Sequence, residues 1–74
     1  MAQISKEQLA RLRLIYSVGC RVELLKMGDI QAPPIGTKGT VKGIDSTGSI
    51  MVSWDSGGSL SVVYGEDFCR RCSE

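Results

Sequence analysis

The sequence has no histidine, few aromatic residues and almost no net charge, and each of these shortages excludes a class of function. Histidine is the usual general base near neutral pH and the commonest metal ligand, and no serine, cysteine or lysine has an evident activating partner, so catalysis is not expected. Nine Lys and Arg residues oppose eight Asp and Glu residues, which leaves a net charge of +1. No overall field therefore attracts nucleic acid or an anionic membrane, and any basic site must be local.

Long apolar runs and an export signal are also missing. No run approaches the roughly 18 residues that a membrane span needs, and the N-terminus lacks a basic segment followed by an apolar one. Three cysteines, an odd number, argue against a disulfide framework. We therefore expect a cytoplasmic protein without membrane association. A chain of 74 residues makes one domain, which we expect to be a monomer or a weak homodimer.

Cys69 and Cys72 have the spacing of half a zinc site or of a redox pair. Zinc needs four ligands, and only Cys20 with Asp67 or Glu66 could supplement these two. Redox chemistry of the thioredoxin type would need a βαβ context, which the sequence does not offer. We favour three ordinary reduced thiols, with no metal and no cofactor.

The stretch from Pro34 to Gly58 predicts a β-hairpin with one apolar face. Strand-favouring residues flank the turn-forming Asp45–Gly48 segment: Thr40, Val41 and Ile44 before it, and Ile50, Val52 and Trp54 after it. Side chains two apart in a strand share a face, so we expect the last three to be buried while Met51 and Ser53 face outward. A ligand-stacking role for Trp54 is the less favoured alternative.

Residues 1–17 predict a short amphipathic helix. Ser5 suits the N-cap and Gln8 stands three residues later, which is the pattern of a capping box. Apolar residues recur at helical spacing, namely Leu9, Leu12 and Ile15 or Tyr16. A helix of about ten residues does not persist alone in water. We therefore expect it to pack on residues 18–74 of its own domain, with a dimerisation or partner helix as the alternative.

The longest irregular segment runs from Lys26 to Gly39 and is here called the proline loop. Pro33 and Pro34 fix two successive φ angles, which makes the loop stiff although it lacks a sheet partner. Two glycines then flank a tight turn that is expected to put Lys38 at an exposed tip. A long loop in so small a domain is usually functional when it is ordered.

Three further strands are expected, around Cys20–Leu24, Leu60–Tyr64 and Cys69–Cys72. The first alternates as a half-buried edge strand, and Gly65–Phe68 looks like a single helical turn before the last. With the hairpin, these segments predict an all-β fold, a small five-stranded barrel with a short N-terminal α-helix. Closure of such a barrel would remove exposed sheet edges.

Three segments resemble the pattern of SH3-like barrels: Val18–Val22, Pro34–Val41 and Val52–Gly57. From Leu9 to Arg71 the chain resembles the domain of unknown function 4314 family of bacteria, phages and mobile elements, with Gln31–Pro34, Gly36–Val41 and Trp54–Asp55 as the most specific parts. This resemblance implies an SH3-like barrel and a genomic setting, but no activity. More distantly, Gly39–Val41 and Val52–Gly57 are similar to the peptide-binding repeats of mind-bomb ubiquitin ligases and to ribosome- and polymerase-associated KOW modules, relatives that bind peptide or RNA.

The chain departs from signalling SH3 domains, which line a groove with several aromatic residues. Its only aromatic residues are Tyr16, Trp54, Tyr64 and Phe68. The resemblance therefore does not imply recognition of proline-rich peptides by an aromatic groove.

Two functional classes follow from the sequence. We favour a non-catalytic module that binds an unknown protein or peptide through the proline loop and the hairpin turns, since functional residues concentrate on loops held by a rigid scaffold. Its candidate binding residues are Pro33, Pro34, Lys38, Met51, Asp55 and Tyr64.

The alternative is nucleic-acid binding through a local basic strand face. Its candidates are Arg21, Lys38, Lys42, Arg70 and Arg71, provided that the first, second and last strands lie together. Glu23 and Asp45 could balance this charge, and with a net charge near zero a solvated face is the preferred interpretation.

Overall fold

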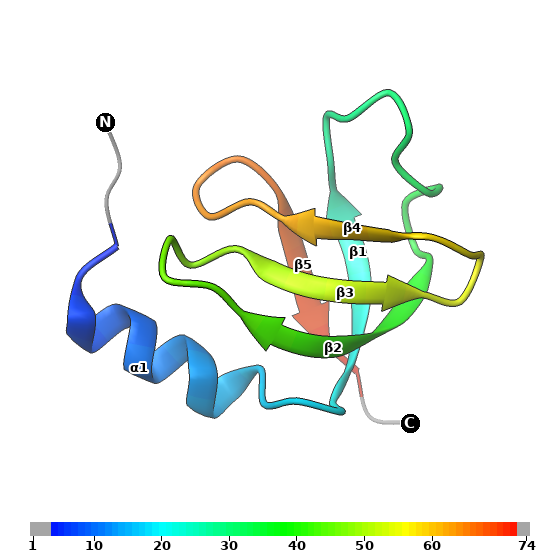
Figure 1. Ribbon diagram of the computed structural model, residues 1–74. Helices are drawn as coiled ribbons and strands as arrows, with labels where there is room; N and C mark the ends of the chain where they lie inside the picture. Colours follow the sequence, from blue (N-terminus) through cyan, green and yellow to red (C-terminus); the bar gives the residue numbers. More distant parts are fainter. Residues whose placement is uncertain (1–3, 73–74) are drawn as a thin grey trace.

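One helix and five antiparallel strands make up residues 4–72, the part of the chain that this computed structural model describes (Figure 1). They are, in chain order, α1 (Lys6–Ile15), β1 (Arg21–Lys26), β2 (Lys38–Ile44), β3 (Ile50–Trp54), β4 (Ser59–Val62) and β5 (Phe68–Arg71). The strands form one sheet in the order β4-β3-β2-β1-β5. The protein is therefore mostly β with one short helix, as the sequence predicts.

Helix α1 begins with the expected capping box. The Ser5 hydroxyl accepts the Gln8 backbone N–H at 3.1 Å, and the Gln8 side chain accepts the Ser5 N–H at 3.2 Å. The stripe of Leu9, Leu12 and Tyr16 packs against the core, although no residue of the helix is fully buried. Its attachment to the sheet is thus limited to one face. Among residues 4–72, no helix combines the length and apolar character that a membrane crossing requires.

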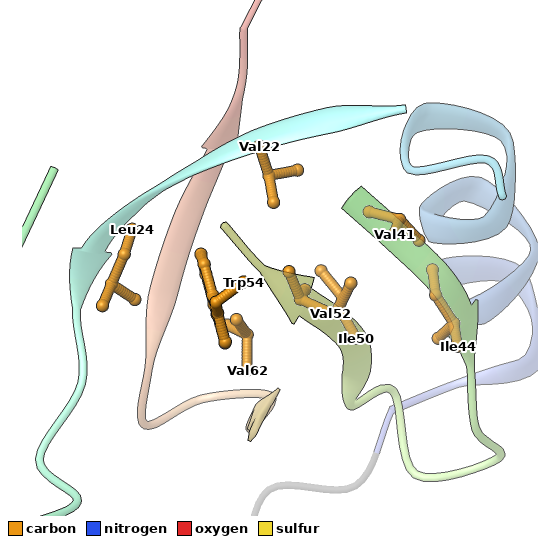
Figure 2. Packing of buried hydrophobic residues seen from close by; sticks show 8 residues of the cluster. All are labelled: Val22, Leu24, Val41, Ile44, Ile50, Val52, Trp54 and Val62. Atoms are coloured by element: carbon orange, nitrogen blue, oxygen red, sulfur yellow. The ribbon is translucent and has the colours of Figure 1, made fainter. Parts of the chain in front are cut away.

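The core is a single cluster of apolar side chains from four strands (Figure 2). It consists of Val22, Leu24, Val41, Ile44, Ile50, Val52, Trp54 and Val62. The predicted phase of β3 is confirmed, because Ile50, Val52 and Trp54 are only 5%, 1% and 3% exposed, whereas Met51 is 41% exposed. The Trp54 indole N–H is also satisfied, since it donates to the Leu60 carbonyl oxygen at 3.0 Å.

Strong bending lets one sheet surround this core. In Figure 1, β2, β3 and β4 run across the view while β1 and β5 run steeply behind them. The register shifts between Val41 and Gly43 and again between Leu24 and Lys26, and an irregularity of this kind bends a strand and increases its twist. Where β2 approaches β3, a Cβ on Gly39 would lie 2.6 Å from a Val52 methyl carbon, so only glycine fits.

The sheet is not closed. β4 and β5 are its two ends, and no ladder joins them within residues 4–72, so the expected barrel closure is not observed. The segment between them forms one tight turn in which the Val63 carbonyl accepts the N–H groups of Glu66 and Asp67. The bond from Asp67 has the i→i+4 spacing of the single helical turn expected from the sequence, but Gly65 has a φ of +86°, which an α-helix does not contain. On β5, the Tyr16 hydroxyl donates to the Cys69 carbonyl at 3.4 Å, which occupies a group that a closing strand would need.

Two local predictions are wrong. β1 is not an edge strand, because it pairs with β2 on one side and β5 on the other. Lys38 is not at a loop tip: the Thr37 N–H donates to the Pro34 carbonyl at 3.0 Å, so the turn closes before Lys38. Lys38 then opens β2 opposite Glu23.

The alternation along β3 yields a stability prediction. Replacing Val52 with Ala removes two buried methyl groups beside Trp54 and should lower the free energy of unfolding by about 1–3 kcal/mol. Met51→Ala on the same strand is the matched control, and its exposed side chain should change stability by less than about 0.5 kcal/mol. Urea denaturation followed by Trp54 fluorescence measures both. Equal effects of the two variants would contradict the assignment of faces.

Candidate interaction site

The proline loop and the β3–β4 turn face each other across a small groove, here called the loop groove. Its volume is about 190 Å³, and it is lined by Gln31, Pro33, Trp54, Ser56, Gly57, Gly58, Ser59 and Leu60. The loop side is held by Asp29, whose carboxylate accepts the Gln31 N–H at 2.7 Å. Of the predicted binding residues, only Pro33 lines this groove, and Pro34 is exposed beside it.

A larger cavity, here called the apolar pocket, opens between α1, the β2–β3 turn and the segment that joins β4 to β5. Its volume is about 410 Å³, and its lining is mostly apolar: Leu12, Tyr16, Gly48, Ile50, Val62, Val63, Tyr64, Gly65, Asp67, Phe68 and Cys69. This size lies in the range of ligand-binding cavities. Tyr64 is the one predicted site residue in it. One signal for this pocket was present in the sequence, since the apolar Val63 and Phe68 break the alternation. In the structure these two side chains are 38% and 51% exposed.

The β2–β3 turn that borders the apolar pocket is held rigidly by Asp45. Its carboxylate accepts the N–H groups of Thr47 and Ser49, both at 3.0 Å, and the Thr47 hydroxyl at 2.6 Å. These bonds, led by the hydroxyl, hold the pKa of Asp45 below its ordinary value. The turn thus fixes Gly48, whose φ of +88° and contact with Tyr64 leave little room for a side chain.

The face of the sheet opposite the core is here called the outer face, and it carries most of the predicted basic residues. Cross-strand partners share a face, so the pairings Arg21–Thr40, Glu23–Lys38 and Glu23–Arg70 place these side chains together. Lys42 and the predicted binding residue Met51 line a shallow hollow on it. Arg71 does not belong to this set, because it pairs with the core residue Val22 and therefore lies on the opposite face.

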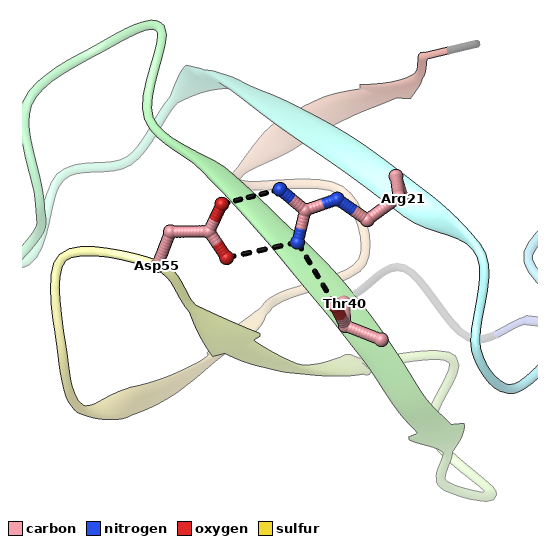
Figure 3. Close-up of polar contacts among 3 residues, drawn as sticks. All are labelled: Arg21, Thr40 and Asp55. Carbon is pink, nitrogen blue, oxygen red and sulfur yellow. Dashed lines mark hydrogen bonds and ion pairs between the residues drawn. The ribbon is translucent and has the colours of Figure 1, made fainter. Parts of the chain in front are cut away.

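Arg21 and Arg70 are both paired with carboxylates of the outer face. Arg21 binds Asp55 through its two terminal guanidinium nitrogens: Nη1 donates to Oδ1 at 2.8 Å, and Nη2 donates to Oδ2 (Figure 3). Nη1 also donates to the Thr40 hydroxyl. These hydrogen bonds hold the pKa of Asp55 below its ordinary value, and Lys38 adds a smaller attraction. Asp55, a predicted binding residue, thus forms an ion pair within the domain.

Arg70 is paired in the same way on the neighbouring strand. Its Nε and Nη2 atoms donate to Glu23 Oε1 at 2.9 and 2.7 Å. Arg21 and Arg70 are therefore matched by acids, which lowers the positive charge of the outer face.

The three cysteines are unpaired and partly buried. Burial raises the pKa of the Cys69 thiol to about 11, and the nearby Cys20 and Cys72 thiols add to this shift. A high pKa disfavours the thiolate, which is the reactive form for both nucleophilic attack and metal binding. Residues 4–72 contain no group of three or more Cys, Asp or Glu side chains arranged to hold a metal ion.

We predict three titratable thiols and no stoichiometric zinc in the purified protein. At pH 8, Cys69 should be alkylated by iodoacetamide most slowly, because a pKa of about 11 in place of 9.0 lowers its thiolate fraction about a hundredfold. Mass spectrometry of timed alkylation and elemental analysis measure the two quantities. One zinc per chain bound with Cys69 and Cys72, or a Cys69 that reacts fastest, would contradict this prediction.

Comparison with known proteins identifies the family of this chain. No curated protein matches the sequence. A family model described as "Domain of unknown function (DUF4314)" matches residues 5–72, which span α1, all five strands, the loop groove and the apolar pocket. The chain therefore belongs to the DUF4314 family.

Proposed function

We propose that this protein is a non-catalytic module that binds an extended segment of a partner protein, with the loop groove as the point of recognition. The proposal rests on one observation: Gln31 and Pro33 of the proline loop line the same groove as the β3–β4 turn, and Trp54 lines it between them. Two segments that are more than twenty residues apart in the sequence thus build one concave surface. Loops held by a rigid scaffold are the usual place for recognition.

The chemistry of the side chains favours binding over catalysis. The sequence has no histidine, and the Cys69 pKa is displaced away from nucleophilic reactivity. The hydrogen bonds from Arg21 hold the pKa of Asp55 below its ordinary value, so this carboxyl group is not poised to exchange a proton near neutral pH.

We also infer that the sheet is an open variant of the SH3-like barrel. Five short antiparallel strands in this order, bent at two irregular pairings, support that interpretation. We further propose a cytoplasmic location, which is supported by three unpaired cysteines that suit a reducing compartment.

Selection from a library of displayed peptides against the full chain tests the proposed function. We expect enriched peptides whose affinity falls about tenfold or more in Ser56→Trp, because an indole at this exposed position fills part of the loop groove. Ile35→Trp is the matched control, since Ile35 lies in the proline loop, is 62% exposed and does not line the groove. Failure to enrich any peptide, or equal binding by both variants, would contradict the proposal.

Nucleic-acid binding is the second candidate, and the gathering of Arg21, Lys38, Lys42 and Arg70 on the outer face favours it. The same face holds Glu23 and Asp55 within ion-pair distance of two of these cations. A nucleic acid would have to compete with both carboxylates for the arginines, which lowers the gain from each phosphate contact. We therefore rank this function below peptide binding.

Salt dependence separates the two candidates. We expect no measurable binding of labelled single- or double-stranded oligonucleotides at moderate salt. If the outer face did bind phosphates, log affinity would fall with log salt by about 0.7 per contact for single strands and about 0.9 for duplexes. Micromolar binding with such a slope, lost in the double variant Lys38→Glu, Lys42→Glu, would replace the preferred function.

A further inference from the structure

The two edge strands of the open sheet, β4 and β5, differ in how far their outward-pointing backbone groups are protected. The Trp54 N–H donates to the Gly58 carbonyl, so this pair at the β3–β4 turn is hydrogen-bonded. Antiparallel pairs alternate between hydrogen-bonded and non-hydrogen-bonded types. Leu60 therefore bonds to Val52 of β3, whereas the N–H and C=O groups of Ser59 and Ser61 point to the free edge of β4. That edge offers two donors and two acceptors.

These four groups have no partner in the described part of the chain. The backbone hydrogen bonds outside the sheet ladders include none to Ser59 or Ser61. Ser59 is exposed and Ser61 is half-buried, so a strand can reach both. The edge also lacks the usual protection, because β4 carries no charged residue, no proline and no bulge.

The opposite edge, on β5, is protected. On this strand the Cys69 carbonyl accepts a hydrogen bond from the hydroxyl of Tyr16, the C-cap residue of α1, and the exposed Arg70 and Arg71 put charge beside the edge. Charged side chains and covering elements are how native sheets prevent pairing with other chains. The contrast singles out β4 as the edge on which pairing is possible.

The side chains of β4 connect this edge to the loop groove and the apolar pocket. Leu60 and Val62 point to the core side, and Leu60 lines the loop groove while Val62 lines the apolar pocket. An added strand places alternate side chains on that same side, about 7 Å apart. A residue opposite Leu60 would face the loop groove of about 190 Å³, and a residue opposite Val62 would face the apolar pocket of about 410 Å³.

We propose that the partner segment binds as a sixth β-strand on the free edge of β4 and presents two apolar side chains two residues apart, the larger one in the apolar pocket. This inference rests on the proposed function and specifies how the partner is recognised. Main-chain hydrogen bonds to Ser59 and Ser61 supply affinity, and the two hollows supply selectivity, which is the usual division in strand addition.

A second copy of this chain fits the edge less well. Pairing that uses both serines of each β4 is centred on Leu60, and it sets Gly58 of the second copy opposite Val62. Glycine has no side chain to enter the apolar pocket. A four-residue edge also buries little surface compared with the 1,000 Å² or so that a stable interface needs.

Two capped pentapeptides test the spacing in a nuclear magnetic resonance titration of the ¹⁵N-labelled full chain. Acetyl-Thr-Leu-Thr-Leu-Thr-amide has alternating leucines, and acetyl-Thr-Leu-Leu-Thr-Thr-amide has the same composition with adjacent ones. We expect the alternating peptide to bind about tenfold tighter and to slow amide exchange at Ser59 and Ser61. Equal affinities, or binding without a change at these two amides, would overturn strand addition.

Ser61→Pro tests the backbone contact on the protein side. It removes an N–H that points outward and leaves the ladder with β3 intact, and proline is tolerated on edge strands. We expect binding about fivefold to tenfold weaker, the effect of losing one hydrogen bond, whereas Ser61→Ala keeps the N–H and the affinity. If Ser61→Pro fails to fold, the alternating peptide with its central amide N-methylated removes the same kind of contact and should show the same loss.

The outcomes separate this inference from the proposed function. If the pentapeptides fail but library peptides still lose affinity in Ser56→Trp, strand addition is wrong and the loop groove remains the recognition site. If neither kind of peptide binds, both proposals are wrong. Light scattering that shows a dimer, converted to a monomer by Ser61→Pro, would assign the edge to a second copy and overturn the inference.

Discussion

The burial of Trp54 is the constraint on which the rest of this small structure depends. Its ring lies in the cluster of buried apolar side chains, and its indole N–H must find an acceptor, which the Leu60 carbonyl provides. Covering so large a ring with one sheet requires strong curvature. Gly39 permits the close approach of β2 to the ring, and the irregular pairings in β2 and β1 bend the sheet around it.

Curvature and short strands together explain why the sheet stays open between β4 and β5. β4 and β5 have four residues each, and the segment between them turns within five residues. Helix α1 then packs beside this opening through Leu12 and Tyr16 instead of a strand ladder. A helix covers apolar surface but makes no hydrogen bonds to the backbone groups at the edge of β4. Packing by α1 in place of a strand therefore leaves both the apolar pocket and the free edge of β4.

The sequence predicts what depends on neighbours along the chain and misses what depends on pairing. The capping box of Ser5 and the alternation of β3 are local, and both are confirmed. Strand pairing, which no local pattern encodes, decides the rest. It sets the face on which Arg71 lies, the inner position of β1 in the sheet and the lack of pairing between β4 and β5 in the described residues. The loop groove was partly predictable, since the proline loop that carries Pro33 was expected to be stiff. The apolar pocket was not, because helix, turn and strand build it together.

The treatment of the two edges bears on what the fold is for. An unpaired edge without charge or proline exposes a marginal domain to aggregation, and the chain has the means to prevent this, as β5 demonstrates. A single lysine in place of Ser59 or Ser61 would protect β4 without disturbing the core, because neither side chain points inward. The absence of such a residue in β4, next to two hollows that an added strand could fill, is more easily understood as a feature of recognition than as a defect of packing.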